Sequence, residues 1–422
     1  MATKGSSVRS VALDERGPRE APRHLRVVAG AESRSRRSGG LAQGIRRAPT
    51  ASILLGVTLL LCLVGLVMVG SASTVISISL YGSPYSLEIR EVMWMALGAV
   101  GLLLAYRVDY HTWRKFRIPL LVVTLAMLAA VLVGGHSAQG ASRWLGVGQL
   151  RIQPSELMKL ALAIFGADLV ARRAQRGARV RAIVMPLALV AGLSAALILL
   201  QPDMGTALVI AAITLALLFG SGMPMGPVMK VLGLLTGLAV VIALLDPYRR
   251  ARLLAFLDPG AHQSGSGYQV LQSLIGLGSG HLTGLGLGAG RQKWGFLPNA
   301  HTDFIFSVVG EEMGLVGALM VLALLGALAW FGLRAAARAP DRFGSLLAIA
   351  LVAWLTSETV INVGAVVGLL PVTGIPLPFI SFGGSSLVIT MFAAGMLMNV
   401  ARHERRPRRG AASPGVTLRP VS

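Results

Sequence analysis

Residues 53–69 read ILLGVTLLLCLVGLVMV, a run that contains no charged side chain. About 20 such residues, rising 1.5 Å each in a helix, cross the hydrocarbon core of a bilayer. Nine further apolar segments follow, some of them shorter, and they begin near Val92, Ile118, Leu157, Ala182, Thr206, Val228, Phe304, Gly344 and Leu387. Backbone amides cannot stay unpaired in lipid, and an aromatic content of only 6% argues against a membrane β-barrel. We therefore predict an all-α polytopic membrane protein with about ten transmembrane helices.

The composition of the whole chain supports this fold class. The 422 residues are 54% apolar and 14% charged, and the mean hydropathy is +0.69. Soluble domains average about 45–50% apolar and about 25% charged residues, so most soluble classes are excluded. Cys62 is the only cysteine, so an intrachain disulfide and a thiolate metal cluster are excluded as well.

The distribution of positive charge predicts the topology. The formal net charge is +21, which in a soluble protein would suggest a nucleic-acid partner. When the first 52 residues are placed inside the cell, 30 of the 39 Lys and Arg residues fall on the inner side and eight on the outer side. Cytoplasmic loops carry such an excess. We therefore expect both termini in the cytoplasm and no nucleic-acid partner.

Three regions follow from this topology. Residues 1–50 form a basic tail without an apolar period, which predicts a disordered cytoplasmic segment. This tail either only sets the topology or also docks to anionic lipid or to division partners. Residues 51–401 form the transmembrane domain, and residues 402–422 form a second basic cytoplasmic tail. Residues 246–303 form a large extracellular loop between the seventh and eighth helices, in which residues 270–277 could form a half-helix at the membrane interface.

Glu156 and Lys159 are the first candidates for chemistry, because ionisable groups in a span need a partner or a function. Their spacing of three places them on one helical face. They form either a self-neutralising pair that holds the bundle or a charged pair that opens on a polar cavity near the outer surface. Arg143, Arg151 and Gln153 add hydrogen-bond donors at the same level, and we favour the cavity.

The segment PNAHTDF at residues 298–304 is the second candidate. Asp303 is expected at the N-terminus of the eighth span, where it serves either as a helix cap or as a base beside a phosphorylated leaving group. Five cations of the same loop could hold a diphosphate, because they match phosphate oxygens in charge and geometry; they are Arg249, Arg250, Arg252, Arg291 and Lys293. His301 is either a second proton carrier or a structural residue.

Other polar positions allow structural as well as functional interpretations. Glu311 and Glu312 must face the protein interior. Asp203 is expected to cap the sixth span, while Glu358 and Asn362 either line the same cavity or bond helix to helix. Seven glycines between residues 276 and 290 indicate tight turns or a close backbone approach to a sugar or lipid headgroup. Residues 371–386 break a helix, which membranes tolerate only where the backbone is buried or lines a cavity.

Seven segments in order resemble the shape, elongation, division and sporulation family, the FtsW/RodA family of peptidoglycan polymerases. They are RWL (143–145), QPSELMK (153–159), QPDMGT (201–206), RRARLLAFLDP (249–259), GYQ (267–269), PNAHTDFIFSVVGEEMG (298–314) and PVTGIPLPFISFGGSS (371–386). The AHTD and RLLAFLDP elements are more similar to the division-associated FtsW branch than to RodA. The sequence departs from the family pattern at Phe382, His281 and Asn299, and none of these changes removes a proposed catalytic group.

The resemblance implies a glycosyltransferase of the bacterial plasma membrane. It would polymerise lipid II into β-1,4 glycan strands at the outer face, with release of undecaprenyl diphosphate during septal wall synthesis. Asp303 then corresponds to the essential loop aspartate, and Glu156 and Lys159 to the functional pair of the fourth span. Gln153 and Ser385 join Arg143, His301 and the loop cations as expected substrate-binding residues.

Further expectations concern partners, a cation and competing functions. The resemblance implies a class B penicillin-binding protein as partner, because the chain has no segment that suits cross-linking, together with other division membrane proteins. No cofactor is required by the pattern, although a divalent cation, Mg²⁺ or Mn²⁺, could bridge phosphates; no ligand set for it is readable. A lipid II flippase and a non-catalytic division scaffold are the alternatives. A flippase needs polar residues along a path through both leaflets. The ionisable residues of the spans lie toward the outer side, apart from Asp168, so we favour the polymerase over the flippase.

Overall fold

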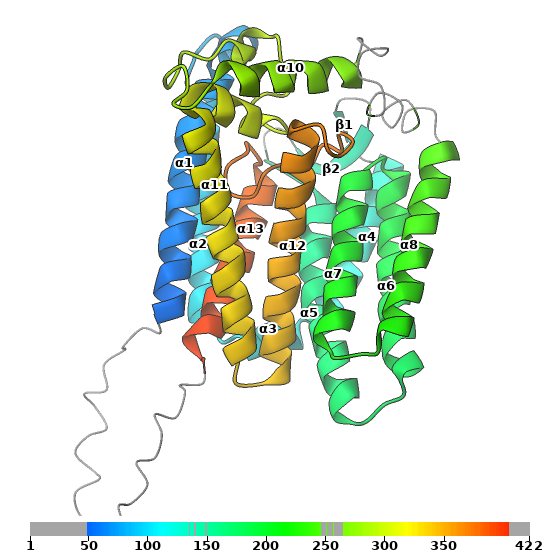
Figure 1. The fold of residues 1–422 in the computed structure, drawn as a ribbon. Helices are drawn as coiled ribbons and strands as arrows, with labels where there is room; N and C mark the ends of the chain where they lie inside the picture. The colour runs from blue at the N-terminus through cyan, green and yellow to red at the C-terminus, as the bar shows by residue number, and fades with distance from the viewer. Residues whose placement is uncertain are drawn as a thin grey trace, which may run out of the picture. The chain divides into compact units, whose positions relative to one another are not determined.

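The computed structural model describes residues 49–134, 136–138, 141–147, 150–245, 250, 256 and 265–404. Within these residues ten long helices form one bundle (Figure 1). They are α1 (Pro49–Tyr81), α2 (Ser86–Arg107), α4 (Arg117–Gly134), α5 (Pro154–Gln175), α6 (Val180–Leu200), α7 (Met204–Gly220), α8 (Met225–Leu245), α11 (Ile305–Arg338), α12 (Arg342–Val366) and α13 (Ser385–Arg402). Each begins close to a predicted start, so the prediction of about ten long helices is confirmed. The expected tails lie almost wholly outside the described residues.

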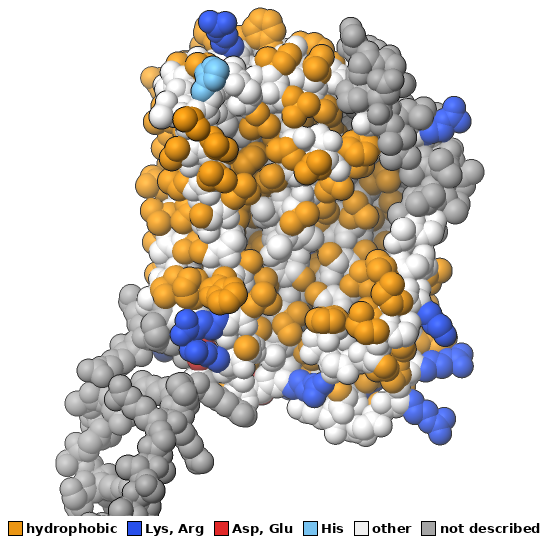
Figure 2. Space-filling view, viewed as in Figure 1, with side chains coloured by type: hydrophobic (Ala, Val, Ile, Leu, Met, Phe, Trp, Pro, Cys, Tyr) orange, Lys and Arg blue, Asp and Glu red, His pale blue; other side chains and the backbone are white. Residues whose placement is uncertain are grey.

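Judged by length and composition alone, seven of the described helices are long and apolar enough to cross a membrane. The other three bundle helices fall short for different reasons: α5 carries Glu156, Lys159 and Asp168, α7 has only 17 residues, and the described apolar part of α8 is also short. Figure 2 shows a broad surface of apolar side chains on the visible face, with Lys and Arg at its two ends. The surface of the described bundle therefore suits a bilayer.

Helices α5, α12 and α13 occupy the interior of the bundle. In the most apolar 18-residue stretch of α13, 78% is buried inside the protein, whereas in that of α4 only 22% is buried. Helix α13 packs along α2, while α5 packs against α4, α7 and α12. Gly98 of α2 faces Met391, and Gly395 of α13 faces the backbone of Leu102. Small residues let helix backbones approach closely in a membrane, where burial of apolar surface gives little driving force.

One end of the bundle, where α1 begins and α13 ends, is called the termini end here, and the opposite end the loop end (Figure 1). The loop end holds three short antiparallel strands in the order β1 (His136–Ala138), β2 (Ala141–Val147) and β3 (Leu150–Ile152). It also holds α10 (Ser266–Ser279), which lies across the helix ends, and the short helix η1 (Gln292–Trp294). The predicted half-helix at residues 270–277 is therefore confirmed as a helix.

Helix α11 is interrupted at Gly314, where φ is 68° and ψ is −167°. The backbone groups that follow bond to a neighbouring loop instead of to their own helix: Leu315 N donates to His281 O at 2.9 Å, and Val316 N to Leu282 O at 3.1 Å. The prediction of one continuous span from Phe304 is therefore wrong in this detail. A positive φ is readily adopted by glycine, so Gly314 permits the break.

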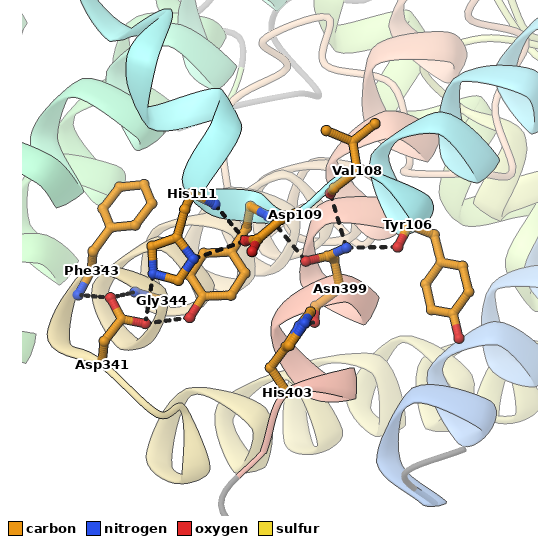
Figure 3. A network of polar contacts seen from close by, with 10 residues as sticks. Tyr106, Val108, Asp109, His111, Asp341, Phe343, Gly344, Asn399 and His403 are labelled. Carbon is orange, nitrogen blue, oxygen red and sulfur yellow. Dashed lines mark hydrogen bonds and ion pairs between the residues drawn. The ribbon is translucent and has the colours of Figure 1, made fainter. Parts of the chain in front are cut away.

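The termini end is held by a network of polar contacts that Figure 3 shows from close by. Asn399 of α13 donates to Tyr106 O at 2.6 Å and to Val108 O at 2.9 Å, and it accepts from Tyr110 N at 3.1 Å. The hydroxyl of Tyr110, in the short helix α3 (Tyr110–Lys115), donates to Asp341, which caps the start of α12. This hydrogen bond and the burial of the ring raise the pKa of Tyr110, desolvation being the larger cause.

Candidate functional site

Lys159 is the centre of a buried charge cluster between α5 and α12. Its Nζ lies 2.7 Å from Glu156 and also donates to Glu358 of α12. The side chain of Lys159 is 1% exposed and that of Glu358 is 3% exposed, while the Trp354 ring centre lies 5.1 Å from Nζ. The predicted proximity of Glu156 and Lys159 is confirmed, and Glu358 is a second partner. The cluster brings together charges that would be costly to bury one by one.

A small cavity of about 10 Å³, near the room that one water needs, adjoins this cluster. Glu156 and Glu358 form part of its wall. Most of the remaining wall comes from the non-helical chain between α12 and α13, including Pro376, Pro378 and Ser381. The interrupted segment at residues 371–386 therefore lines this small cavity, which is one of the two alternatives expected for it; several of its residues are also buried.

Asp303 lies half-buried, one residue before Phe304, the N-cap residue of α11. Asn362 Nδ2 donates to Asp303 O and to Ile375 O, both at 2.7 Å, so α12 holds the Asp303 segment and the 371–386 segment together. The two segments are in close contact, because a Cβ placed on Gly374 would lie 3.5 Å from Asp303 Oδ2. Asn362 follows Glu358 by four residues on the same face of α12. One helix face therefore links the Lys159 cluster to Asp303.

Two more contacts join the same segments. Ser381 Oγ donates to Thr302 O at 2.6 Å and accepts from Leu377 N at 2.8 Å, while Phe382 N donates to His301 O at 3.0 Å. Burial lowers the pKa of His301 to about 4, so its imidazole is neutral at pH 7. Asn299 has a φ of 58°, a left-handed conformation that Asn tolerates better than most residues.

Gln153 belongs to a polar group at the start of α5. Its Nε2 lies 3.0 Å from Ser155 Oγ and 3.2 Å from Asp203 Oδ2, and its backbone N donates to Ser385 Oγ at 3.3 Å. Asp203 accepts from Thr206 N at 3.1 Å and therefore caps α7, as predicted. Gln153 and Ser385, which the sequence places 232 residues apart, are thus in direct contact.

Arg143 lies in β2 and contacts backbone rather than acidic side chains. Its Nε donates to Gln201 O at 3.0 Å, and its Nη2 donates to Pro202 O. These bonds attach the strands of the loop end to the turn between α6 and α7. In this arrangement the guanidinium stabilises the loop end, while a role in binding diphosphate stays a prediction.

Glu311 and Glu312 are buried, as their place in a span predicts, and their partners are mainly backbone amides of the glycine-rich loop. Glu312 accepts from Gly288 N at 3.0 Å, and Glu311 accepts from Arg291 N at 2.7 Å. Lys293 Nζ lies 3.2 Å from Glu312 Oε1. The loop folds against the first part of α11, so its glycines permit close backbone approach to this helix.

The remaining loop cations differ in what the structure shows of them. Arg250 and Arg291 are exposed at the loop end. Arg249 and Arg252 lie outside the described residues, so the expected group of five cations is seen only in part. His281 has a φ of 45°, a conformation that glycine adopts more readily than histidine. The described residues contain no group of three His, Cys, Asp or Glu side chains that could hold a metal ion.

The bundle, the interrupted α11 and the carboxylate site define the class: a multi-pass helical membrane protein with a polar site at one end. The family of cell cycle proteins that unites FtsW, RodA and SpoVE matches residues 51–406. The chain belongs to this family. It therefore shares the family's membrane-embedded fold.

Named relatives cover almost the same region. The chain is 38% identical to the stage V sporulation protein E of Bacillus subtilis, covering 84% of this chain and 97% of that protein. It is 41% identical to the probable peptidoglycan glycosyltransferase FtsW of Aliivibrio salmonicida, covering 84% of this chain and 89% of that protein.

Solved structures show the same fold. A chain of a structure described as "Structural coordination of polymerization and crosslinking by a peptidoglycan synthase complex" matches with a TM-score of 0.68 at 32% identity, covering 84% of this chain and 98% of that chain. The rod shape determining protein RodA of Thermus thermophilus matches with a TM-score of 0.63 at 28% identity, covering 84% of this chain and 97% of that chain.

Proposed function

We propose that the chain is a peptidoglycan glycosyltransferase that polymerises lipid II into β-1,4 glycan strands. The loop end would face the outside of the plasma membrane, where the reaction takes place during septal wall synthesis. The carrying observation is that Asn362 of α12 joins the Asp303 segment to the 371–386 segment, one turn from the Glu358–Lys159 contact. Relatives named as probable peptidoglycan glycosyltransferases support this activity.

Asp303 is the proposed general base. The attacking sugar hydroxyl must lose its proton as it bonds to the anomeric carbon of the donor, and a carboxylate within hydrogen-bond reach can accept it. The bond from that carbon to the diphosphate breaks in the same displacement, so the configuration inverts. Burial lowers the pKa of His301 to about 4, so this side chain adds no positive charge beside Asp303 at pH 7. We assign the base to Asp303 because its segment is the one that Asn362 fixes next to residues 371–386.

The departing diphosphate requires positive charge. Arg250 and Arg291 are exposed at the loop end and are proposed to contact it. Lys159 already bonds two carboxylates, so we propose that it positions α5 against α12, while its expected contact with the diphosphate stays a prediction. A divalent cation also stays a prediction. No step proposed here uses it.

A class B penicillin-binding protein is the proposed partner, and it would cross-link the strands that this chain makes. A relative of known structure belongs to a peptidoglycan synthase complex that coordinates polymerisation and crosslinking, which supports a partner of this kind. Other division membrane proteins are proposed to recruit the pair to the septum.

The test is glycan formation from purified lipid II by the full chain reconstituted with a class B partner. Asp303→Asn keeps the size of the side chain and should lower polymer formation by about 10²- to 10⁴-fold, the usual contribution of general acid–base catalysis. Its melting temperature and partner binding should match those of the wild type. Glu88→Gln, a matched loss of one carboxylate in the first turn of α2 at the same end, should retain activity.

If Asp303→Asn polymerises as fast as the wild type, Asp303 is not the base. If neither protein makes polymer while lipid II crosses the vesicle membrane, the flippase alternative replaces this proposal.

A further inference from the structure

A cavity of about 500 Å³ lies at the termini end, where α5 ends and α6 begins. Three arginines line it: Arg173, Arg179 and Arg181. The rest of its lining includes Met185 and Leu189, which are 59% and 71% exposed. The cavity is open, and its exposed lining is mainly apolar although three of its lining residues are arginines. It lies far from the loop end that holds Asp303 (Figure 1).

The local sequence explains why Arg173 lies in this cavity. Pro186 lies inside α6 and has no N–H, so the carbonyl of Ala182, four residues earlier, loses its helical partner. Arg173 Nη1 donates to that carbonyl instead. In a membrane, neighbouring groups commonly bond to the backbone that a proline releases. The proline thereby attaches a guanidinium to the wall of the cavity.

The lining follows one stripe of α6. Arg181, Met185 and Leu189 are spaced four residues apart, so they lie on the same helical face. Eight residues of helix rise about 12 Å, and this length leads from a charged side chain to two apolar ones. In Figure 2, Lys and Arg side chains gather below the apolar surface near the ends of α5 and α6. A lipid that lay along this stripe would therefore meet the charged side chain at one end and the two apolar side chains at the other.

The charge of this region is not balanced by nearby acids. Residues 169–202 contain no Asp or Glu. Arg172 bonds to Asp168 at 2.8 Å, together with Arg114 and Arg117, whereas no salt bridge involves Arg179 or Arg181 within the described residues. The first turn of α6 contains no acidic residue and has no side-chain cap, so its positive dipole end adds to the arginines.

We propose that this cavity binds an anionic glycerophospholipid from the leaflet at the termini end. Its phosphodiester would lie among Arg173, Arg179 and Arg181, and one acyl chain would lie along Met185 and Leu189. Basic pockets between transmembrane helices bind anionic headgroups in this way. A soluble phosphate would use only the arginine head groups, whereas the mainly apolar lining suits an acyl chain.

The test uses the full chain, purified and delipidated in detergent, and measures binding of dioleoyl phosphatidylglycerol by native mass spectrometry. Arg179→Gln/Arg181→Gln should weaken binding about thirtyfold. Each arginine near a membrane surface contributes about 1 kcal/mol, and every 1.4 kcal/mol changes the dissociation constant about tenfold. Arg179→Lys/Arg181→Lys should retain most of the affinity. The control Arg107→Gln/Lys115→Gln removes the same charge from exposed positions at the same end and should change affinity less than twofold.

Three further probes identify the ligand class. Dioleoyl phosphatidylcholine, inorganic phosphate and glycerophosphoglycerol should each compete at least tenfold more weakly than phosphatidylglycerol, and Leu189→Asn should weaken phosphatidylglycerol alone. Equal competition by inorganic phosphate would show a phosphate site instead of a lipid site. Equal loss of affinity in the Arg107→Gln/Lys115→Gln control would show that only net charge matters, and either result would overturn the proposal.

Discussion

Replacing Lys159 with methionine should strongly destabilise the bundle. The variant keeps much of the side-chain length but removes the one cation that bonds both Glu156 and Glu358. Both carboxylates are almost fully buried, so bulk water does not solvate them in place of the ammonium. Two facing carboxylates would then remain without their shared partner. The protein must respond by protonating one of them, by admitting water or by opening the α5–α12 contact.

The loss of folding free energy can be estimated from other buried ion pairs, in which removal of one partner costs about 3–5 kcal/mol. With an unfolding entropy of about 2.1 cal/mol/K per residue over roughly 350 residues, this corresponds to a fall of about 4–7 °C in melting temperature. Removing both acids as well should recover stability, because a neutral cluster has no unpaired charge. We therefore expect Glu156→Gln/Lys159→Met/Glu358→Gln to melt closer to the wild type than Lys159→Met.

The assay is tryptophan-fluorescence melting in detergent, paired with glycan synthesis from lipid II at a temperature where all variants are folded. If the Lys159→Met protein melted within 1 °C of the wild type, the conclusion that Lys159 stabilises the two buried carboxylates would be refuted. The triple variant also tests the predicted diphosphate contact. If its stability returns while its activity does not, Lys159 has a role in the reaction in addition to its role in packing.

Three other variants test separate parts of the structure. Asn399→Leu leaves three backbone partners unpaired and should cost about 3 kcal/mol, read as a lower melting temperature; Asn399→Asp should not restore it, because a carboxylate cannot donate to the carbonyls of Tyr106 and Val108. Gly314→Ala should lower both melting temperature and polymer formation, because φ there is 68° and a Cβ would meet the backbone of Gly284; an unchanged protein would contradict the proposed break. His301 has a folded pKa near 4, below its unfolded value of about 6.5, so the stability from its neutral form is present above pH 6.5 and lost as pH falls toward 4. His301→Gln should therefore melt with less dependence on pH between 6.5 and 4.

The spans were predictable because length and hydropathy are properties of each segment alone. Ten described helices begin near the predicted residues, from Pro49 in α1 to Ser385 in α13. The proximity of Glu156 and Lys159 was predictable for the same reason, since helical spacing sets it locally. Glu358 as the second partner of Lys159 could not be assigned, because 199 residues separate them and several helix arrangements would satisfy the same hydropathy.

The features that the sequence did not reveal depend on side chains bonding to distant backbone. The three short strands of the loop end have at most seven residues each and no alternating apolar pattern. Arg143 bonds carbonyls of the α6–α7 turn, and Glu311 and Glu312 bond amides of the glycine-rich loop. A backbone group has no residue signature, so spacing between charged residues cannot identify it as a partner. One signal was present, because a charged pair in a span next to a glycine-rich loop suggests acids that accept from exposed amides.

The break at Gly314 connects these observations with the proposed reaction. A continuous α11 would leave the loop around His281 and Leu282 without the backbone partners Leu315 and Val316. It would also change how Glu311 and Glu312 face the amides of residues 288–292, and thus where the loop that carries Arg291 lies. Asp303 and the N-cap residue Phe304 lead into the short first part of this helix, which ends at the break. Gly314 therefore links the loop that carries Arg291, the proposed diphosphate ligand, to the helix that follows Asp303, the proposed base. We expect the proposed reaction to be sensitive to substitution of this glycine for that reason.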